Sequence, residues 1–116
     1  METFYLYKSD RPEKKFVMIM PTYKHKHYFG SSKHRDFTLM NNKNSKFFEP
    51  NKVIRNQVKN AYLQRHAKHK KGIHSASSMS DIILWSKPTL NQGIRAFEKK
   101  FKVKIVFSNK VYNDKL

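Results

Sequence analysis

The sequence has no cysteine among its 116 residues, and it has only three glycines and four prolines. The absence of cysteine excludes a disulfide framework and a zinc site with thiolate ligands. The low content of glycine and proline argues against a fibrous or low-complexity chain. The length suits one folded domain, residues 1–116, with a single modest core.

Long hydrophobic runs are missing as well. The longest purely apolar stretch, residues 16–21, is far shorter than the roughly 20 residues that a membrane-spanning helix needs. The first residues contain neither a basic segment nor a long apolar stretch, so no signal peptide is predicted. We therefore expect a soluble protein that is not secreted.

Acidic residues are scarce relative to basic ones. Eight Asp and Glu face twenty-five Lys and Arg, which gives a formal net charge of +17. Self-repulsion at this level disfavours the compact state unless an anionic partner relieves it, and nucleic acid, an anionic membrane surface or an acidic protein could do so. The excess is greatest in residues 41–71, which carry nine basic residues and one acidic residue.

The first forty residues have the pattern of short β-strands. Apolar and aromatic runs at residues 4–7, 16–20, 27–29 and 37–40 are separated by residues that favour turns. Such a series is typical of an antiparallel meander, so up to four strands are expected here.

The period of the apolar residues changes after residue 50. One helical face is marked by Ile54, Val58, Ala61 and Tyr62. Asn51 is a suitable N-cap for this helix, because its side-chain oxygen can accept a hydrogen bond from the first turn. We expect the helix to continue through the basic residues 68–71 and to stop at Gly72.

The second half predicts two further helices and a strand. A capping box that begins at Ser78 precedes a short helix over residues 82–85, which Pro88 ends, and a second capping box begins at Thr89. A core-facing stripe follows at Leu90, Ile94, Phe97 and Phe101. Alternation over residues 103–107 predicts a strand with one buried face. The predicted fold is α+β: a small antiparallel sheet, made of the N-terminal meander and a C-terminal strand, with two or three helices from the second half packed on it.

Several short motifs occur over most of residues 8–90: Arg11-Pro12-Glu13-Lys14-Lys15, Phe29-Gly30, Asp36-Phe37-Thr38, Tyr62-Leu63-Gln64-Arg65-His66 and Leu84-Trp85-Ser86-Lys87-Pro88-Thr89-Leu90. In these motifs the chain resembles a family of small, uncharacterised basic proteins encoded by large nucleocytoplasmic DNA viruses. The resemblance implies a viral source and is compatible with a virion component, located in the virion or inside the infected cell. It implies no particular activity.

The basic residues supply the candidate binding site. Cations crowd the predicted end of the middle helix, and no acid occurs between Glu49 and Asp81 to pair with them. A second basic segment, residues 24–35, interleaves lysines with aromatic rings, a combination that can hold phosphates and stack bases. The predicted nucleic-acid-binding residues are Lys59, Arg65, His66, Lys68, His69, Lys70, Lys71, Lys24, Lys26, Lys33 and Arg35.

We therefore expect non-enzymatic, largely sequence-independent binding to the phosphate backbone of DNA or RNA. Three alternatives remain open. The cationic face could simply be solvated, the chain could be a minor capsid protein that contacts acidic neighbouring subunits, or it could be an accessory subunit of a large ribonucleoprotein. The aromatic residues of the basic segment, and Trp85, fit the core at least as well as a binding surface.

Metal binding and catalysis have weaker support. His25 with His27, and His66 with His69 and His74, have spacings that zinc could use, but the local positive charge disfavours a cation. No phosphate-binding glycine loop or nucleophile motif is present, and Asp10, Glu13 and Asp36 offer little for a Mg²⁺ site. No metal, no cofactor and no enzymatic activity are expected.

Overall fold

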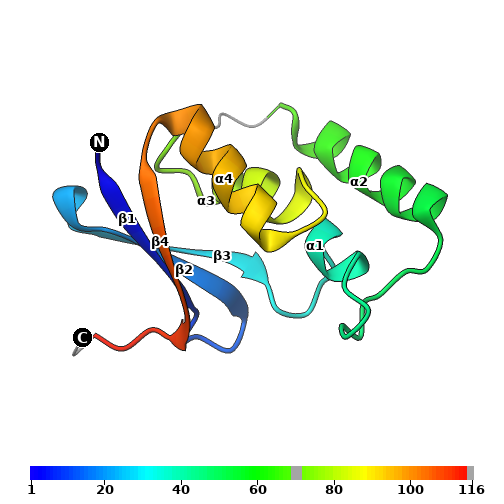
Figure 1. The fold of residues 1–116 in the computed structure, drawn as a ribbon, viewed down its shortest axis with the longest axis horizontal. Coiled ribbons are helices and arrows are strands. Elements are labelled where there is room, and N and C mark those ends of the chain that lie inside the picture. Colours follow the sequence, from blue (N-terminus) through cyan, green and yellow to red (C-terminus); the bar gives the residue numbers. More distant parts are fainter. Residues whose placement is uncertain (69–71, 115–116) are drawn as a thin grey trace.

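A mixed sheet organises the fold. The structure is a computed structural model that describes residues 1–68 and 72–114, and in this part of the chain four strands form one sheet. The strands are β1 (Thr3–Lys8), β2 (Lys14–Met20), β3 (His25–Ser31) and β4 (Lys104–Val111), in the order β3-β2-β1-β4 (Figure 1). A 3-10 turn, η1 (Pro21–Tyr23), joins β2 to β3.

The α+β class predicted from the sequence is confirmed, but the sheet is not entirely antiparallel. β1, β2 and β3 pair antiparallel as a meander, because short turns connect them. β4 instead pairs parallel to β1. The reason is the long helical connection between β3 and β4. It carries the chain back across the sheet, so β4 enters beside β1 and runs in the same direction.

Alternating side chains of the strands build the core. Phe4 and Leu6 of β1, Met18 and Met20 of β2, and Phe29 of β3 are all buried in one hydrophobic cluster. The predicted alternation at the C-terminal strand is present, with Val103 and Ile105 buried and Phe107 partly buried against the same cluster.

The helices form the second layer. They are α1 (Phe37–Met40), α2 (Lys52–His66), α3 (Ala76–Met79), a π-helical continuation η2 (Ser80–Trp85), and α4 (Leu90–Phe101). α3, η2 and α4 pack toward the sheet, whereas α2 lies farther out, against α1 and η2 (Figure 1). No helix in residues 1–68 and 72–114 is both long and apolar enough to cross a membrane.

Residues 37–40 form the helix α1, so the prediction of a fourth meander strand here is wrong. Asp36 caps the helix, because its Oδ1 accepts a hydrogen bond from the backbone N–H of Leu39 at 2.9 Å. Phe37 and Met40 are the two buried residues of this segment. Their spacing of three places them on one side of a helical turn, whereas a strand would separate them.

The helix α2 begins as predicted but ends earlier. Asn51 caps it through hydrogen bonds from the N–H groups of Val53 at 2.9 Å and Ile54 at 3.3 Å. The last helical residue is His66, so Lys68 lies beyond the helix and Gly72 does not terminate it. Cationic side chains in adjacent turns repel one another, and no acid lies four residues away to pair with them. This repulsion weakens the helix at its C-terminal end. Residues 69–71 lie outside the described residues.

The next helix starts at Ala76, capped by Ser75, so the predicted start at Ser78 is wrong. Ser75 Oγ accepts from the N–H of Ser78, which is itself buried within α3. The wider turns of η2 then bring Ile83, Leu84 and Trp85 into the core.

The helix α4 confirms its sequence pattern. Thr89 Oγ1 accepts from the N–H of Gln92 at 3.2 Å, and Ile94 and Phe97 are buried. Gly93 lies against the main chain of η2, where a Cβ atom would overlap the carbonyl oxygen of Ile83. A glycine is therefore required for α4 to approach η2 this closely.

Candidate nucleic-acid interface

A cationic hollow lies between the loop after β3 and the C-terminal half of α2. Its volume is about 440 Å³. Arg35, from the loop, and Arg65, near the end of α2, both line it, and both residues are exposed. Their segments are far apart in the sequence, so the fold brings together the two basic segments that the sequence singled out. We call this feature the arginine hollow. It is lined by Ser31, His34, Arg35, Val58, Tyr62, Arg65, His66 and Trp85.

A ladder of stacked rings forms one wall of the arginine hollow. The Tyr62 ring lies 4.0 Å from the Trp85 ring, centroid to centroid, with only 6° between their planes. On its other side the His66 ring stacks on Tyr62 at 4.1 Å and 21°. Trp85 is buried, as the core interpretation of this residue predicted. The ladder therefore extends from the core to the hollow and holds His66 in place beside Arg65.

Tyr62 is fixed as a neutral hydroxyl. Burial raises the pKa of Tyr62 above its ordinary value, and a hydrogen bond to Asp81 acts in the same direction. Asp81 is buried in η2, so this contact ties α2 to the core helix. Trp85 and His66 cover both faces of the Tyr62 ring, so a base could contact only the edge of Tyr62 or the outer face of His66.

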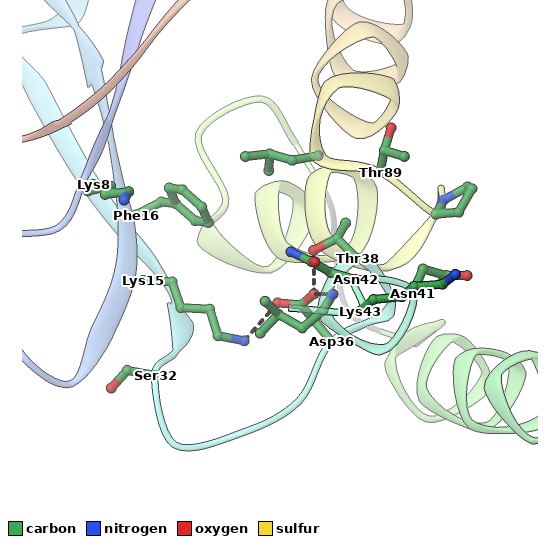
Figure 2. A pocket seen from close by; sticks show the side chains of 13 residues that line it. Lys8, Lys15, Phe16, Ser32, Asp36, Thr38, Asn41, Asn42, Lys43 and Thr89 are labelled. Atoms are coloured by element: carbon green, nitrogen blue, oxygen red, sulfur yellow. Dashed lines mark hydrogen bonds and ion pairs between the residues drawn. The ribbon is translucent and has the colours of Figure 1, made fainter. Parts of the chain in front are cut away.

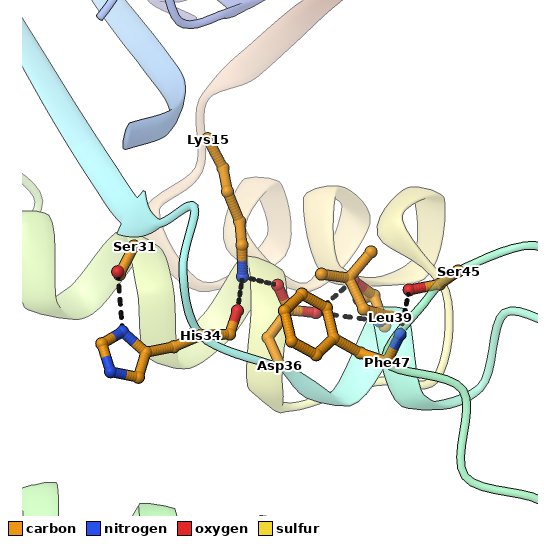
Figure 3. Close-up of polar contacts among 8 residues, drawn as sticks. Lys15, Ser31, His34, Asp36, Leu39, Ser45 and Phe47 are labelled. Atoms are coloured by element: carbon orange, nitrogen blue, oxygen red, sulfur yellow. Dashed lines mark hydrogen bonds and ion pairs between the residues drawn. The ribbon is translucent and has the colours of Figure 1, made fainter. Parts of the chain in front are cut away.

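The loop that carries Arg35 is held by Lys15 of β2 (Figure 3). Lys15 Nζ donates to the carbonyl oxygen of His34 at 2.7 Å and forms an ion pair with Asp36 Oδ2 at 2.7 Å. Asp36 is 1% exposed, so this is a buried ion pair. At the start of the loop the His34 ring bonds to Ser31 Oγ through Nδ1, at 2.7 Å. The loop therefore has a defined shape, and the position of Arg35 is set by the fold.

The arginine hollow gathers some of the predicted binding residues. Arg35, Arg65 and His66 line it, and Lys33 is exposed on the same loop. Lys68 follows α2 and is also exposed. The predicted residues His69, Lys70 and Lys71 lie outside the described residues.

Other predicted residues lie elsewhere. Lys59 is half-buried, with its Nζ 4.9 Å from the centroid of the Phe37 ring. Lys24 and Lys26 lie at the start of β3, at the opposite end of the strand from the loop. Lys26 Nζ pairs with Asp114 Oδ1 at 3.3 Å and lies over the Tyr112 ring. The structure thus does not bring these three lysines into the arginine hollow.

Sequence reasoning missed Tyr62 and His34 as site residues. The spacing of Tyr62 and His66, four residues apart on one helix, was a usable signal, because side chains at i and i+4 are neighbours. The stacking of Tyr62 on Trp85 joins residues from separate helices and had no such signal.

Many acidic groups of the chain have neutral partners. Tyr23 donates to Glu2 at 2.9 Å, and Tyr28 donates to Asp10 at 2.7 Å. Glu98 accepts from the backbone N–H of Ile105 at 2.8 Å. These hydrogen bonds hold strands and turns together, and the eight carboxylates still leave a net charge of +17.

Three histidines meet at the far end of β3. The ring centroids of His25 and His27 are 5.8 Å apart, and each is 6.2 Å from His74, which precedes α3. Tyr23 also contacts His74, at 4.3 Å. Among residues 1–68 and 72–114, no group of three or more histidine or acidic side chains has the arrangement of a metal site. The ring contacts place His74 beside His25 and His27 of β3.

The histidine cluster predicts a dependence of stability on pH. Burial lowers the pKa of His27 below its usual 6.5, and the charges of His25 and His74 lower it further. The unfolded chain then binds more protons than the folded one. The contribution of neutral His27 to stability is therefore fully present above pH 6.5 and is lost as the pH falls from there through the lowered pKa. We expect a lower Tm at pH 5.5 than at pH 7.5 in thermal denaturation. The variant His27→Gln should show a smaller difference, and an equal or larger one would contradict this origin.

The fold and the arginine hollow define a basic α+β protein with a cationic hollow beside a ladder of stacked rings. Comparisons of this chain with protein-family models, with curated proteins and with solved structures found no match.

Proposed function

We propose that this protein binds nucleic acid without catalysis, mainly through the phosphate backbone and without strong sequence readout. The observation that carries the proposal is the convergence of Arg35 and Arg65 beside the stacked rings of Tyr62 and His66. Guanidinium groups bind phosphates as a planar fork, and aromatic faces accept any base, so the pair suits a polyanion of bases and phosphates.

The net charge of +17 supports the same proposal. Release of counterions from phosphates would relieve the repulsion within the chain, which its own carboxylates leave largely in place. The carboxylates of Asp10 and Asp36, considered above for a Mg²⁺ site, are engaged separately by Tyr28 and Lys15. The resemblance to basic proteins of large DNA viruses supports a virion-associated setting.

The salt dependence of binding tests this function. We expect the purified chain to shift mixed-sequence DNA and RNA in electrophoresis at low salt. If about four phosphates are neutralised, log affinity falls against log salt with a slope of about −3.6, or roughly 100-fold between 50 and 200 mM. A slope near zero, or no shift of either polymer in dilute buffer, would contradict the proposal and favour an acidic protein partner.

A further inference from the structure

A second and larger hollow is lined in part by Ser32 and Asp36, from the loop that carries Arg35 (Figure 2). Its volume is about 630 Å³, which falls within the roughly 300–1,000 Å³ of small-molecule sites. β1, β2, α1 and the start of α4 all contribute to it. Neither Arg35 nor Arg65 lines it. We call it the base hollow.

Apolar side chains line much of the base hollow. Phe16, Leu39, Pro88 and Leu90 contribute from β2, α1 and the two sides of the α4 N-terminus. The Phe16 ring is held in place by stacking on Phe29 at 5.8 Å and by an edge contact with Phe107 at 6.4 Å. A rigid aromatic ring with a proline and two leucines is a suitable surface for a planar, largely apolar group.

Cations and amides also line the base hollow. Lys8 and Lys43, both exposed, come from β1 and from the turn after α1 (Figure 2). Asn41 donates its Nδ2 to the carbonyl oxygen of Phe37, and Asn42 accepts from the N–H of Asn44 through Oδ1. Each amide therefore retains a hydrogen-bonding group, an acceptor on Asn41 and a donor on Asn42. The carboxylate of Asp36 also lines the hollow, but its charge is balanced by Lys15.

The two hollows share the loop between β3 and α1. Ser32 and Asp36 line the base hollow, while His34 and Arg35 line the arginine hollow. A chain of nucleotides that crosses this loop could place phosphates at Arg35 and Arg65 and bring a base of the same strand to the base hollow.

We infer that the base hollow seats one unpaired base of a single-stranded nucleic acid, with Lys8 and Lys43 on the neighbouring phosphates. This inference rests on the proposed function and names its substrate class. A base inside a duplex is stacked and paired, so it cannot enter a hollow of this kind without leaving the helix. A fatty acyl chain would use the apolar wall, but it offers no partner to the remaining acceptor of Asn41 or the remaining donor of Asn42, whereas a base edge can bond to both.

The test compares two single strands of equal length, one with bases and one with abasic sugars throughout, by fluorescence anisotropy. Stacking of a base on apolar and aromatic side chains predicts about 10-fold tighter binding of the strand with bases. Asn42→Leu removes the amide and places a branched, non-aromatic side chain at the exposed rim of the base hollow, so it should reduce this difference. Asn56→Leu, on the exposed face of α2, is the matched control and should retain it.

The outcomes separate the inference from the proposed function. Equal affinity for the two strands, or a preference that Asn42→Leu leaves intact, would overturn the base hollow while phosphate binding stands. Failure of both strands to bind in dilute buffer would overturn the proposed function. In that case, NMR titration with uridine 5′-monophosphate and with ribose 5-phosphate decides the hollow. Shifts at Phe16, Leu39 and Leu90 with the nucleotide alone would support a nucleotide site, and their absence would overturn it.

Discussion

Asp36→Ala should lower the free energy of unfolding by about 3–5 kcal/mol, and Tm by on the order of 10 °C. The substitution leaves Lys15, whose side chain is 13% exposed, as an unpaired cation next to the core. It also removes the acceptor for the Leu39 N–H and the Thr38 hydroxyl, which together begin α1. Thermal and urea denaturation of the variant measure the loss.

Two further variants show whether the buried charge causes the effect. Asp36→Asn keeps an acceptor for the cap but loses the charge, so it should recover only part of the stability. Asp114→Ala removes the exposed ion pair with Lys26, in which the Lys26 side chain is 41% exposed and the Asp114 side chain 68%. This variant should lower the free energy of unfolding by no more than about 1 kcal/mol. Equal losses for Asp36→Ala and Asp114→Ala would show that burial of the Lys15 pair contributes nothing.

Joint replacement of Arg35 and Arg65 by Glu should weaken binding to DNA and RNA about 100-fold at low salt, roughly 10-fold for each reversed charge. Both side chains are exposed on the arginine hollow, so the fold should survive. The log–log salt slope should become shallower by about two, because two phosphate contacts are lost. Electrophoretic shift or anisotropy at several salt concentrations measures both quantities, and circular dichroism checks the fold.

The matched control reverses two charges elsewhere. Lys99 and Lys100 are exposed near the end of α4 and line neither the arginine hollow nor the base hollow. The pair Lys99→Glu and Lys100→Glu changes the net charge by the same amount, yet it should weaken binding far less. An equal effect of the two pairs would mean that net charge alone drives binding and that the arginine hollow is not the site.

The elements with clear periodicity were predictable from the sequence. The stripe from Leu90 to Phe101 and the alternation after residue 102 each had one buried face, and that face meets the core. The caps at Asn51 and Thr89 were equally predictable, because a side-chain oxygen at a helix start satisfies a local N–H whatever the tertiary structure.

The errors occur where tertiary contacts decide the structure. Residues 37–40 are too short to show a period, and the buried cap at Asp36 together with the burial of Phe37 and Met40 selects a helix. The parallel pairing of β4 with β1 depends on the path of the helical connection, which local sequence does not specify. In α2 the pattern predicted the helix but not its burial, since Val53 and Ile54 remain 63% and 40% exposed.

The candidate site was predictable in its charge but not in its geometry. Composition identified the two basic segments, because an excess of cations is visible without a structure. It could not show that Arg35 and Arg65 share one hollow while Lys26 is paired with Asp114. The base hollow had no sequence signal, since Phe16, Leu39 and Pro88 come from three segments.

Mapping the protein surface that contacts nucleic acid tests the central claim most directly. In an NMR titration with a short oligonucleotide in dilute buffer, we expect the largest shifts at Arg35 and Arg65 and along the loop between β3 and α1. Largest shifts at Arg95, Lys99 and Lys100 of α4 would contradict the site, and no shift with either DNA or RNA would contradict the function itself.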